Sequence, residues 1–278
     1  MPLALILSSH VAGSRVGGYL QALALNHFGV EPVLVPTVLF GRHPGWGAPG
    51  GGKVEATVMA GMLQGIAANG LYAHVNVVIC GYFADAAQVE TAALAIAEAR
   101  TANPDVVVLV DPILGDADKG LYVKPEVAEA VKARLLPLAD ILTPNAFELG
   151  WLSGRSGLDD RAALTAAAGA LPPATVIVTS PPAPAGETGA LLVHRGAASL
   201  LLHPKLAEAP KGTGDLMVAL LAARVIKGDA MEEALTRALD GVVEALECAK
   251  DWGSPEIPIA SLAPRLTQPP ARTRIAEA

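Results

Sequence analysis

Five consecutive apolar residues, Val-Val-Val-Leu-Val at positions 106–110, place the strongest constraint on the fold of this chain. A β-branched run without polar alternation is typical of a strand buried on both faces of a parallel sheet. Similar short runs occur at residues 3–7, 75–81 and 175–179, and stretches of helical composition separate them. This alternation predicts an α/β fold with a mostly parallel central sheet flanked by helices.

The remaining elements follow the same pattern along the chain. No linker interrupts it, and 278 residues is a common size for one large α/β domain, so we expect a single domain at residues 1–278. The proline-rich segment 253–278 is predicted to be a partly flexible tail. Extended segments are expected at residues 31–36 and 141–142, antiparallel strands at 191–193 and 199–202, and helices at 17–28, 53–69, 86–101, 125–136, 161–170, 213–227 and 231–252.

The composition excludes several classes of protein. Hydrophobic residues make up 52% of the chain and charged residues 17%, which supplies a core and excludes disorder of the body. The net charge of −7 argues against nucleic acid as a partner, because a phosphate backbone needs a basic face. Residues 56–84 contain no Asp, Glu, Lys or Arg, but polar residues and glycines interrupt them. We therefore expect a helix, a turn and a strand there and no membrane span.

The N-terminus and the cysteines favour the cytoplasm. Residues 1–7 lack the basic region of a signal peptide and are expected to enter the core as a strand. Cys80 lies in an apolar run, so a buried, reduced thiol is expected there. Neither Cys80 nor Cys248 has the spacing of a metal ligand. The chain is therefore expected to be a soluble cytoplasmic protein.

The turn KGTGD at residues 211–215 leads straight into an alanine- and leucine-rich helix. Gly212 and Gly214 let backbone N–H groups crowd together at a helix start, where free donors and the helix dipole favour an anion. Asp215 follows this cradle and is expected to stay ionised and to accept a proton from an attacking hydroxyl. Thr213 would also serve as an N-cap, but capping does not require two glycines beside a carboxylate. The turn therefore predicts half of a site for phosphoryl transfer.

Polar residues also follow three of the predicted strands, where ligands bind in parallel sheets. Asp111 either caps a turn or faces a Mg²⁺ ion that bridges nucleotide phosphates. Asn145 and Glu148 either form a capping box at a helix start or bring a carboxylate to the metal. Thr179 ends the third strand. Taken one at a time, these motifs leave both alternatives open.

Other catalytic patterns do not occur in the sequence. There is no Walker-type phosphate loop, no glycine-rich fingerprint after the first strand and no serine hydrolase pattern. His10, His43 and His74 show no ligand spacing, and His203 is expected at the surface. The glycines at 50–52 lie in a proline-containing stretch, which predicts a mobile loop rather than a nucleotide cradle.

Taken together, these motifs resemble the ribokinase-like superfamily and, within it, the pyridoxal kinases. The segment SSHV (8–11) resembles the family's opening segment, DPILGD (111–116) its Asp-Pro-x-x-Gly-Asp segment, and TPNAFEL (143–149) its Thr-Pro-Asn-x-x-Glu-x segment. GTGD (212–215) matches the anion-hole and base motif of the superfamily. The resemblance covers nearly the whole chain in order and implies a three-layer sandwich.

The resemblance implies an ATP-dependent kinase that phosphorylates the 5′-hydroxyl of pyridoxal, with pyridoxine and pyridoxamine as further substrates, in vitamin B6 salvage. Asp215 would activate the hydroxyl for attack on the γ-phosphate. The backbone of Gly212, Thr213 and Gly214 would hold the charge of the transition state.

The resemblance also implies the binding residues. Asp111 and Glu148 would organise Mg²⁺ and the phosphates, with Thr143 near the nucleotide. The substrate would contact a serine of the opening segment. The expected assembly is a homodimer, and the remaining expected site residues are Ser9, Val11 and His43 for the substrate and Lys211 for the nucleotide.

Two departures from the family pattern stand out. The flap commonly reads Asn-His-Thr-Gln in pyridoxal kinases, whereas this chain reads RHPG at residues 42–45. The lost Thr and Gln side chains would have contacted the substrate. A lysine common near the nucleotide is replaced by Thr179 and Ser180, so Lys211 is the candidate that supplies the charge instead.

Three alternatives are weaker. Hydroxymethylpyrimidine kinases share the fold but often carry cysteine at the position of Asp215. Sugar kinases carry an Asp and Gly-Gly patterns near the first strands that this chain lacks. A non-catalytic B6-binding protein would explain the altered flap, but it would not explain the intact Gly212–Asp215 turn.

Overall fold

The computed structural model describes residues 1–206 and 209–276, and its dominant element is one large sheet. Within the described residues, its ten strands lie in the order β12-β11-β10-β9-β8-β5-β4-β1-β2-β3. The six strands from β9 to β2 are parallel, and antiparallel strands extend both edges. Their bounds are β1 Leu3–Val11, β2 Glu31–Phe40, β3 Gly51–Lys53, β4 Val75–Cys80, β5 Val107–Val110, β8 Ile141–Leu142, β9 Thr175–Thr179, β10 Glu187–His194, β11 Ala197–Pro204 and β12 Arg274–Ile275.

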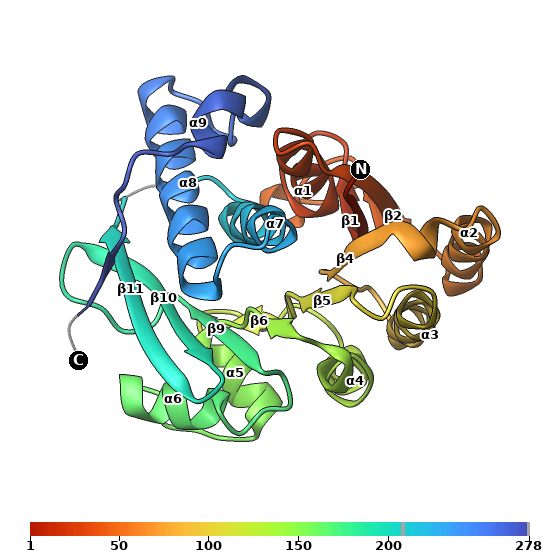
Figure 1. Cartoon of the computed structure of the whole chain (residues 1–278), viewed down its shortest axis with the longest axis horizontal. Helices are drawn as coiled ribbons and strands as arrows, with labels where there is room; N and C mark the ends of the chain where they lie inside the picture. Colours follow the sequence, from red (N-terminus) through yellow and green to blue (C-terminus); the bar gives the residue numbers. More distant parts are fainter. Residues whose placement is uncertain (207–208, 277–278) are drawn as a thin grey trace.

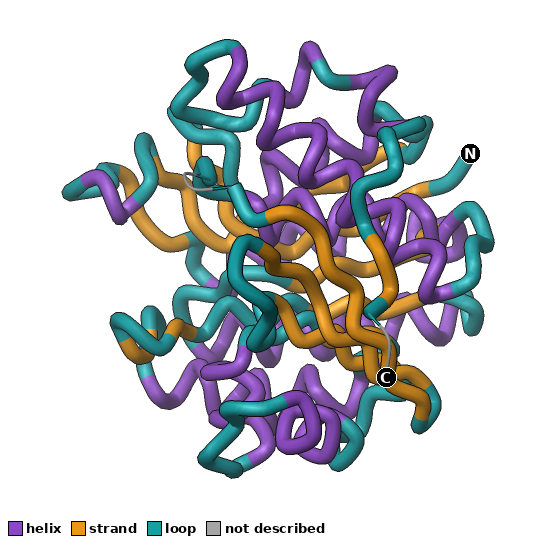
Figure 2. Tube along the Cα trace, turned by 90° about the vertical axis from the view of Figure 1, so that its left-hand side faces the viewer, coloured by secondary structure: helices purple, strands orange, loops and turns teal. Residues whose placement is uncertain are grey.

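Helices cover both faces of this sheet, so the molecule has three layers (Figure 1). Figure 2 shows the strands lying between two layers of helices. A separate small ribbon pairs β6 (Gly115–Asp116) with β7 (Gly120–Leu121). One helical layer holds α2 (Ala56–Ala68), α3 (Ala86–Ala102), α4 (Pro125–Ala130), α5 (Ala146–Ser153) and α6 (Arg161–Ala168), and the other holds α1 (Gly17–Asn26), α7 (Thr213–Ile226), α8 (Met231–Asp251) and α9 (Ala263–Thr267).

Alternate side chains of the central strands enter two separate cores. In β1, Leu5 and Leu7 belong to the core that includes side chains of α2 to α6, whereas Ala4 and Ile6 belong to the core with α1, α7 and α8. All four side chains are fully buried. A strand covered on both faces needs apolar residues at successive positions, which explains the unbroken run at residues 106–110.

Most of the predicted elements are confirmed. The parallel sheet, its flanking helices and the antiparallel pair β10 and β11 all form as the sequence indicates. The helix predicted at residues 125–136 is interrupted, because α4 ends at Ala130 and a π-helical turn follows at Val131–Leu135. Cys80, predicted to be a buried thiol, is fully buried and unbridged. Burial raises its pKa to about 12.

The prediction of a mobile loop at residues 50–52 is wrong in part. Gly51–Lys53 forms the edge strand β3, which pairs with residues 38–40 of β2, and α2 begins at Ala56 rather than at residue 53. Gly51 has a left-handed backbone with φ of +76°, and a Cβ there would lie 2.0 Å from the carbonyl oxygen of Leu39. Glycine is therefore required for this pairing.

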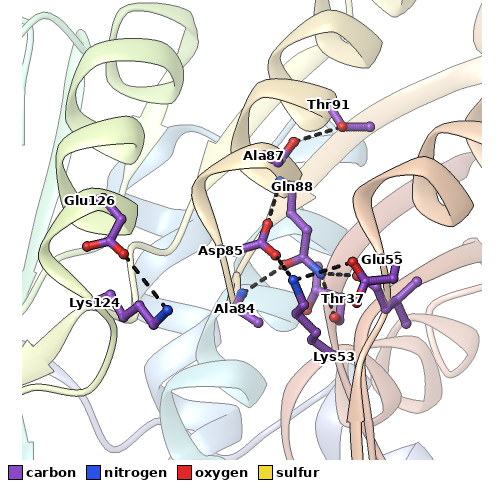
Figure 3. A network of polar contacts seen from close by, with 11 residues as sticks. Thr37, Lys53, Glu55, Ala84, Asp85, Ala87, Gln88, Thr91, Lys124 and Glu126 are labelled. Carbon is purple, nitrogen blue, oxygen red and sulfur yellow. Dashed lines mark hydrogen bonds and ion pairs between the residues drawn. The ribbon is translucent and has the colours of Figure 1, made fainter.

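The base of the β2–β3 hairpin is fastened to the start of α3 (Figure 3). The buried side-chain amide of Gln88 donates hydrogen bonds to the carbonyl oxygens of Thr37 and Val54, at 2.7 and 2.6 Å. Asp85 accepts a hydrogen bond from the backbone N–H of Gln88 and another from Lys53 Nζ, at 3.1 and 2.6 Å. Two strand segments and one helix are thus joined through two side chains.

The chain after α8 returns along the helical layer that contains α1 and α7 (Figure 1). Its strand β12 pairs with β11 at one edge of the sheet. The apolar residues that this segment buries are Ile257, Ile259, Leu262 and Leu266. The partial flexibility of the tail and the division into one domain stay predictions, and residues 277–278 of the tail lie outside the described residues. In the part of the chain that the structure describes, no helix is long and apolar enough to span a membrane.

Candidate active site

A cavity of about 900 Å³ opens at the carboxyl ends of the parallel strands, as expected for this type of sheet. Strands β1 and β9, the residues that directly follow β5 and β8, and the first turn of α7 all contribute to its wall. The cavity brings together every residue that the sequence singled out for the site, namely Ser9, Val11, His43, Asp111, Thr143, Glu148, Lys211, Gly212, Thr213, Gly214 and Asp215.

The glycine turn before α7 is held in place by its backbone conformation. Gly212 is the N-cap residue, with a left-handed φ of 92°, and α7 begins at Thr213. A Cβ on Gly212 would lie 2.5 Å from the carbonyl oxygen of Arg15, so a larger residue does not fit. The hydroxyl of Thr213 donates a hydrogen bond to the Pro210 carbonyl at 3.0 Å and fastens the turn instead of capping the helix. The first N–H groups of α7 therefore have no partner within the helix and can bind an anion.

Asp215 lies in the first turn of α7, directly after these donors. Its Oδ1 atom is buried and has no hydrogen-bond partner among the described residues. Burial raises the pKa of Asp215 to about 6, against the opposing effect of a hydrogen bond from the backbone of Gly17. The sequence predicts a carboxylate that stays ionised, and a pKa of about 6 agrees with this, because such a group is still mostly deprotonated at pH 7. Such a carboxylate is poised to take up a proton near pH 7.

Asp111 and Thr143 meet across neighbouring strand ends. The Thr143 hydroxyl donates a hydrogen bond to Asp111 Oδ1 at 2.9 Å. The pKa of Asp111 is raised well above its usual range, first by burial and then by the negative charges of Glu148 and Asp215. Among the described residues, no side-chain cation forms an ion pair with Asp111. A bound cation would relieve this repulsion.

Glu148 is held entirely by backbone groups. The capping box is confirmed: Asn145 Oδ1 accepts from the Glu148 N–H, and Glu148 Oε2 accepts from the Asn145 N–H, both at 2.9 Å. Its other oxygen, Oε1, accepts from the N–H groups of Leu114 and Gly115, at 2.8 and 3.3 Å. Burial raises the pKa of Glu148, while these backbone donors lower it. Glu148 therefore fixes the loop after Asp111 against the start of α5.

The opposite end of the cavity is formed by β1 and the flap after β2. Ser9 lies so close to Gly17 that a Cβ on this glycine would be 2.0 Å from the serine Oγ. His43 accepts a hydrogen bond on Nδ1 from the Gly45 N–H at 3.0 Å, so its neutral ring carries the proton on Nε2. Burial lowers the pKa of His43, and the charge of Lys211 lowers it further. A neutral histidine with a free donor thus faces this end.

Several cavity residues carried no clear signal in the sequence. Lys119 and Tyr122, on either side of the Gly120–Leu121 strand, line the mouth, with Lys119 Nζ 5.9 Å from the centre of the tyrosine ring. Together with Lys211, Lys119 supplies positive charge that Thr179 does not provide. A lysine before a glycine in a polar loop is too common in protein sequences for Lys119 to be predicted as a site residue from sequence alone.

The position predicted for His203 is wrong. The sequence predicts a surface position, but this side chain is 7% exposed and lines the cavity, because it continues the buried run of β11. The apolar wall beside it is formed mainly by α7 and α8. It consists of Met217, Leu239, Val242, Leu246 and Leu206.

The groups that line the cavity are best suited to binding a polyanion beside a group that accepts a proton. Backbone donors and two lysines attract a polyanion, and a buried carboxylate beside them accepts a proton. Within residues 1–206 and 209–276, no group of three or more His, Cys, Asp or Glu side chains is placed to hold a metal ion unaided. This arrangement fits a Mg²⁺ ion that keeps water and phosphate ligands, as that ion usually does. Transfer of a phosphoryl group to a hydroxyl uses all of these features.

Comparisons with known proteins agree with this chemistry. The family model for phosphomethylpyrimidine kinase matches residues 55–260. The chain is 37% identical to a pyridoxine/pyridoxal/pyridoxamine kinase of Bordetella avium, over 94% of this chain and 90% of that protein. It is 34% identical to a pyridoxal kinase of Rubrobacter xylanophilus, over 96% of this chain and 94% of that protein.

Solved structures of pyridoxal kinases are also similar to this chain. The pyridoxal kinase of Leishmania donovani in complex with ADP and pyridoxamine superposes with a TM-score of 0.90, at 26% identity, covering 99% of this chain and 98% of that one. A structure of a phosphomethylpyrimidine kinase from Bacteroides thetaiotaomicron has a TM-score of 0.88 at 21% identity, which supports the fold alone.

Proposed function

The chain belongs to the pyridoxal kinases of the ribokinase-like superfamily, and from this premise we propose that it transfers the γ-phosphoryl group of ATP to the 5′-hydroxyl of pyridoxal. Pyridoxine and pyridoxamine are expected as further acceptors, in line with the printed name of the Bordetella relative. The observation that carries the proposal is the buried carboxylate of Asp215, one oxygen of which has no partner in the part of the chain that the structure describes, in the first turn of the helix that begins after Gly212.

The proposed reaction uses these two groups in one step. The 5′-oxygen of pyridoxal forms a bond to the γ-phosphorus while the bond from that phosphorus to the bridging oxygen of ADP breaks. Asp215 accepts the proton of the hydroxyl as its oxygen attacks. The backbone N–H groups of Thr213 and Gly214 stabilise the negative charge on the transferred group, because they are already oriented toward it.

Asp111 is the residue that we propose to hold Mg²⁺. Its carboxylate is buried, repelled by two other carboxylates and unpaired with any cation of the described residues, so it fits a divalent ion. Both oxygens of Glu148 already accept backbone hydrogen bonds, and any contribution of Glu148 to the ion would pass through water. When bound, Mg²⁺ neutralises charge on the phosphates.

We propose that each end of the cavity binds one of the two substrates. We propose that ATP places its base against the apolar wall of α7 and α8 and its phosphates near Thr143, Lys211 and Lys119. The pyridine ring of the acceptor would lie between Ser9, Val11 and His43. This arrangement brings the acceptor hydroxyl toward Asp215.

Two wider properties belong to the same proposal. We propose a homodimer, which the family resemblance implies. We also propose a cytoplasmic location, where ATP is available and where Cys80 and Cys248 stay reduced, as both cysteines are unbridged.

The deciding experiment is phosphorylation by ATP and Mg²⁺ of pyridoxal, pyridoxine, pyridoxamine and hydroxymethylpyrimidine, measured side by side. We expect turnover of pyridoxal with kcat/KM at least about tenfold above that of the pyrimidine. Preference for hydroxymethylpyrimidine would favour the activity that gives its name to the matching family model. Binding of pyridoxal without turnover of any acceptor would favour a sensor and contradict the proposal.

A further inference from the structure

The segment after α8 reaches back to the first loop of the chain. Glu256 Oε2 accepts a hydrogen bond from the backbone N–H of Arg15 at 2.9 Å, across 241 residues of sequence. The other carboxylate oxygen of Glu256 is buried and accepts no hydrogen bond from residues 1–206 or 209–276. Ile257 and Ile259 on the same segment are buried and anchor it. Glu256 is therefore held beside the loop that joins β1 to α1.

That loop touches the catalytic turn at two points. The carbonyl oxygen of Arg15 lies where a Cβ of Gly212 would be, at 2.5 Å. Two residues later, the backbone of Gly17 acts on the carboxylate of Asp215 and lowers its pKa, and both residues line the same cavity. The peptide unit that Glu256 holds is thus next to the groups that set the position of the base and of the anion-binding turn.

Glu256 acts at a distance from the substrates. It does not line the cavity, whereas Val16 and Gly17 of the loop do. Its charge still reaches the flap, where it opposes the effect of the lysines on the pKa of His43. Its influence on the reaction therefore passes through the backbone of residues 15–17.

We propose that Glu256 is a positioning residue, which fixes the loop at residues 12–17 against Gly212 and keeps the backbone of Gly17 in place to act on Asp215. This role rests on the proposed kinase activity, in which Asp215 is the base. It makes part of the C-terminal segment a component of the active site, although the sequence predicts a partly flexible tail there.

A matched control exists on the same tail and the same helix. His27 Nε2, at the end of α1 away from the loop, makes a hydrogen bond with the Ile259 carbonyl at 2.8 Å. The His27→Ala variant therefore loosens the tail without releasing Arg15. Glu256→Gln retains an oxygen that accepts the Arg15 N–H, and Glu256→Ala does not.

The test compares these three variants with the parent, using the full chain. Kinetics with pyridoxal and ATP give kcat and KM, and amide hydrogen exchange without substrates gives the mobility of residues 12–17. For Glu256→Ala we expect kcat to fall about tenfold, the KM for ATP to stay within about threefold, and exchange in the loop to accelerate about tenfold. Glu256→Gln and His27→Ala should both stay within about threefold of the parent in kcat and in exchange of this loop.

Three outcomes would overturn the proposal. They are an unchanged kcat in Glu256→Ala whether or not its loop exchanges faster, an equal loss of kcat in His27→Ala, and a Glu256→Gln variant as slow as Glu256→Ala. If the parent phosphorylates no B6 vitamer, the proposed function fails by itself. The exchange measurement then still decides whether Glu256 holds the loop.

Discussion

At the catalytic end of the cavity, Glu148 joins its own helix to backbone groups 34 residues away, and the Thr143 side chain reaches Asp111 across 32 residues. Within the flap itself, at residues 42–49, the contacts are local. His43 accepts a hydrogen bond from Gly45, two residues along the chain, and its ring lies 5.9 Å from that of Trp46, which is 43% exposed. Long-range hydrogen bonds hold the residues that we propose for the reaction, whereas local contacts leave the proposed acceptor site free to change in sequence.

This contrast explains where the chain departs from its family. The segments that resemble the pyridoxal kinases most fully are those tied together across the sheet. The flap, where the family resemblance implies Thr and Gln and this chain has Pro44 and Gly45, depends on neighbours within a few residues. Substitutions in the flap therefore disturb few partners, and substitutions at the catalytic end disturb many.

The largest effect is expected at Asp215. The Asp215→Asn variant should lower kcat by about 10²–10⁴-fold, because an amide cannot accept the hydroxyl proton. The affinity for ATP should change little, since the base acts in the transition state. Steady-state kinetics and calorimetric titration with ATP measure the two quantities, with Asp251→Asn as an exposed control. Equal kcat in variant and parent would remove Asp215 from the mechanism.

A smaller effect is expected at Asp111. In Asp111→Ala, the Mg²⁺ concentration for half-maximal rate should rise about 10–100-fold, the scale on which metal sites respond to lost partners. Asp105→Ala, in the exposed turn before β5, is the matched control and should leave the titration unchanged. An unchanged Mg²⁺ titration in Asp111→Ala would contradict a role in metal binding and would favour the alternative that Asp111 caps a turn.

The pH dependence tests the environment of Asp215. The base must be deprotonated to act, and burial raises its pKa to about 6, so activity should be lost as the pH falls through that value. We expect kcat/KM to be about tenfold lower at pH 5 than at pH 7. The profile should be recorded with saturating Mg²⁺ at each pH. A flat profile down to pH 5 would mean that desolvation of Asp215 is lost when the substrates bind.

The smallest effect is expected in the flap. His43→Ala should raise the KM for pyridoxal by about 3–10-fold, the value of one hydrogen bond, and leave the KM for ATP unchanged. His74→Ala, an exposed histidine outside the cavity, is the control. If His43→Ala lowered kcat as much as Asp215→Asn does, the flap would act in the chemical step and not only in binding of the acceptor, which would contradict the contrast between the two ends of the cavity.

The sequence is sufficient to predict the catalytic end for a physical reason. Asp111, Thr143 and Thr179 each follow a parallel strand, and the carboxyl ends of such strands meet at one edge of the sheet. The position of Asp215 follows from the glycine turn at a helix start. In these cases the local pattern fixes the place of the side chain, and the cavity contains all of them.

The remaining parts depend on packing that no local pattern encodes. Two glycines form most of β3 against their usual strand preference, because pairing with β2 outweighs propensity. The apolar wall of α8 cannot be distinguished from ordinary core positions in the sequence. The contact between Glu256 and Arg15 joins opposite ends of the chain. Desolvation of Asp215 is likewise a property of the folded state.

The division of the core into two halves has a consequence for synthesis of the chain. The helices that cover one face of the sheet, α2 to α6, are complete by residue 168, and the strands β9 to β11 that finish this face follow by residue 204. The other face, with Ile6, Ile79, Leu109 and Ile177, is covered largely by α7 and α8, which are made last. A nascent chain that has emerged as far as β11 therefore presents a sheet whose second apolar face is covered by α1 but not yet by α7 and α8, and we expect it to be prone to aggregation during that interval.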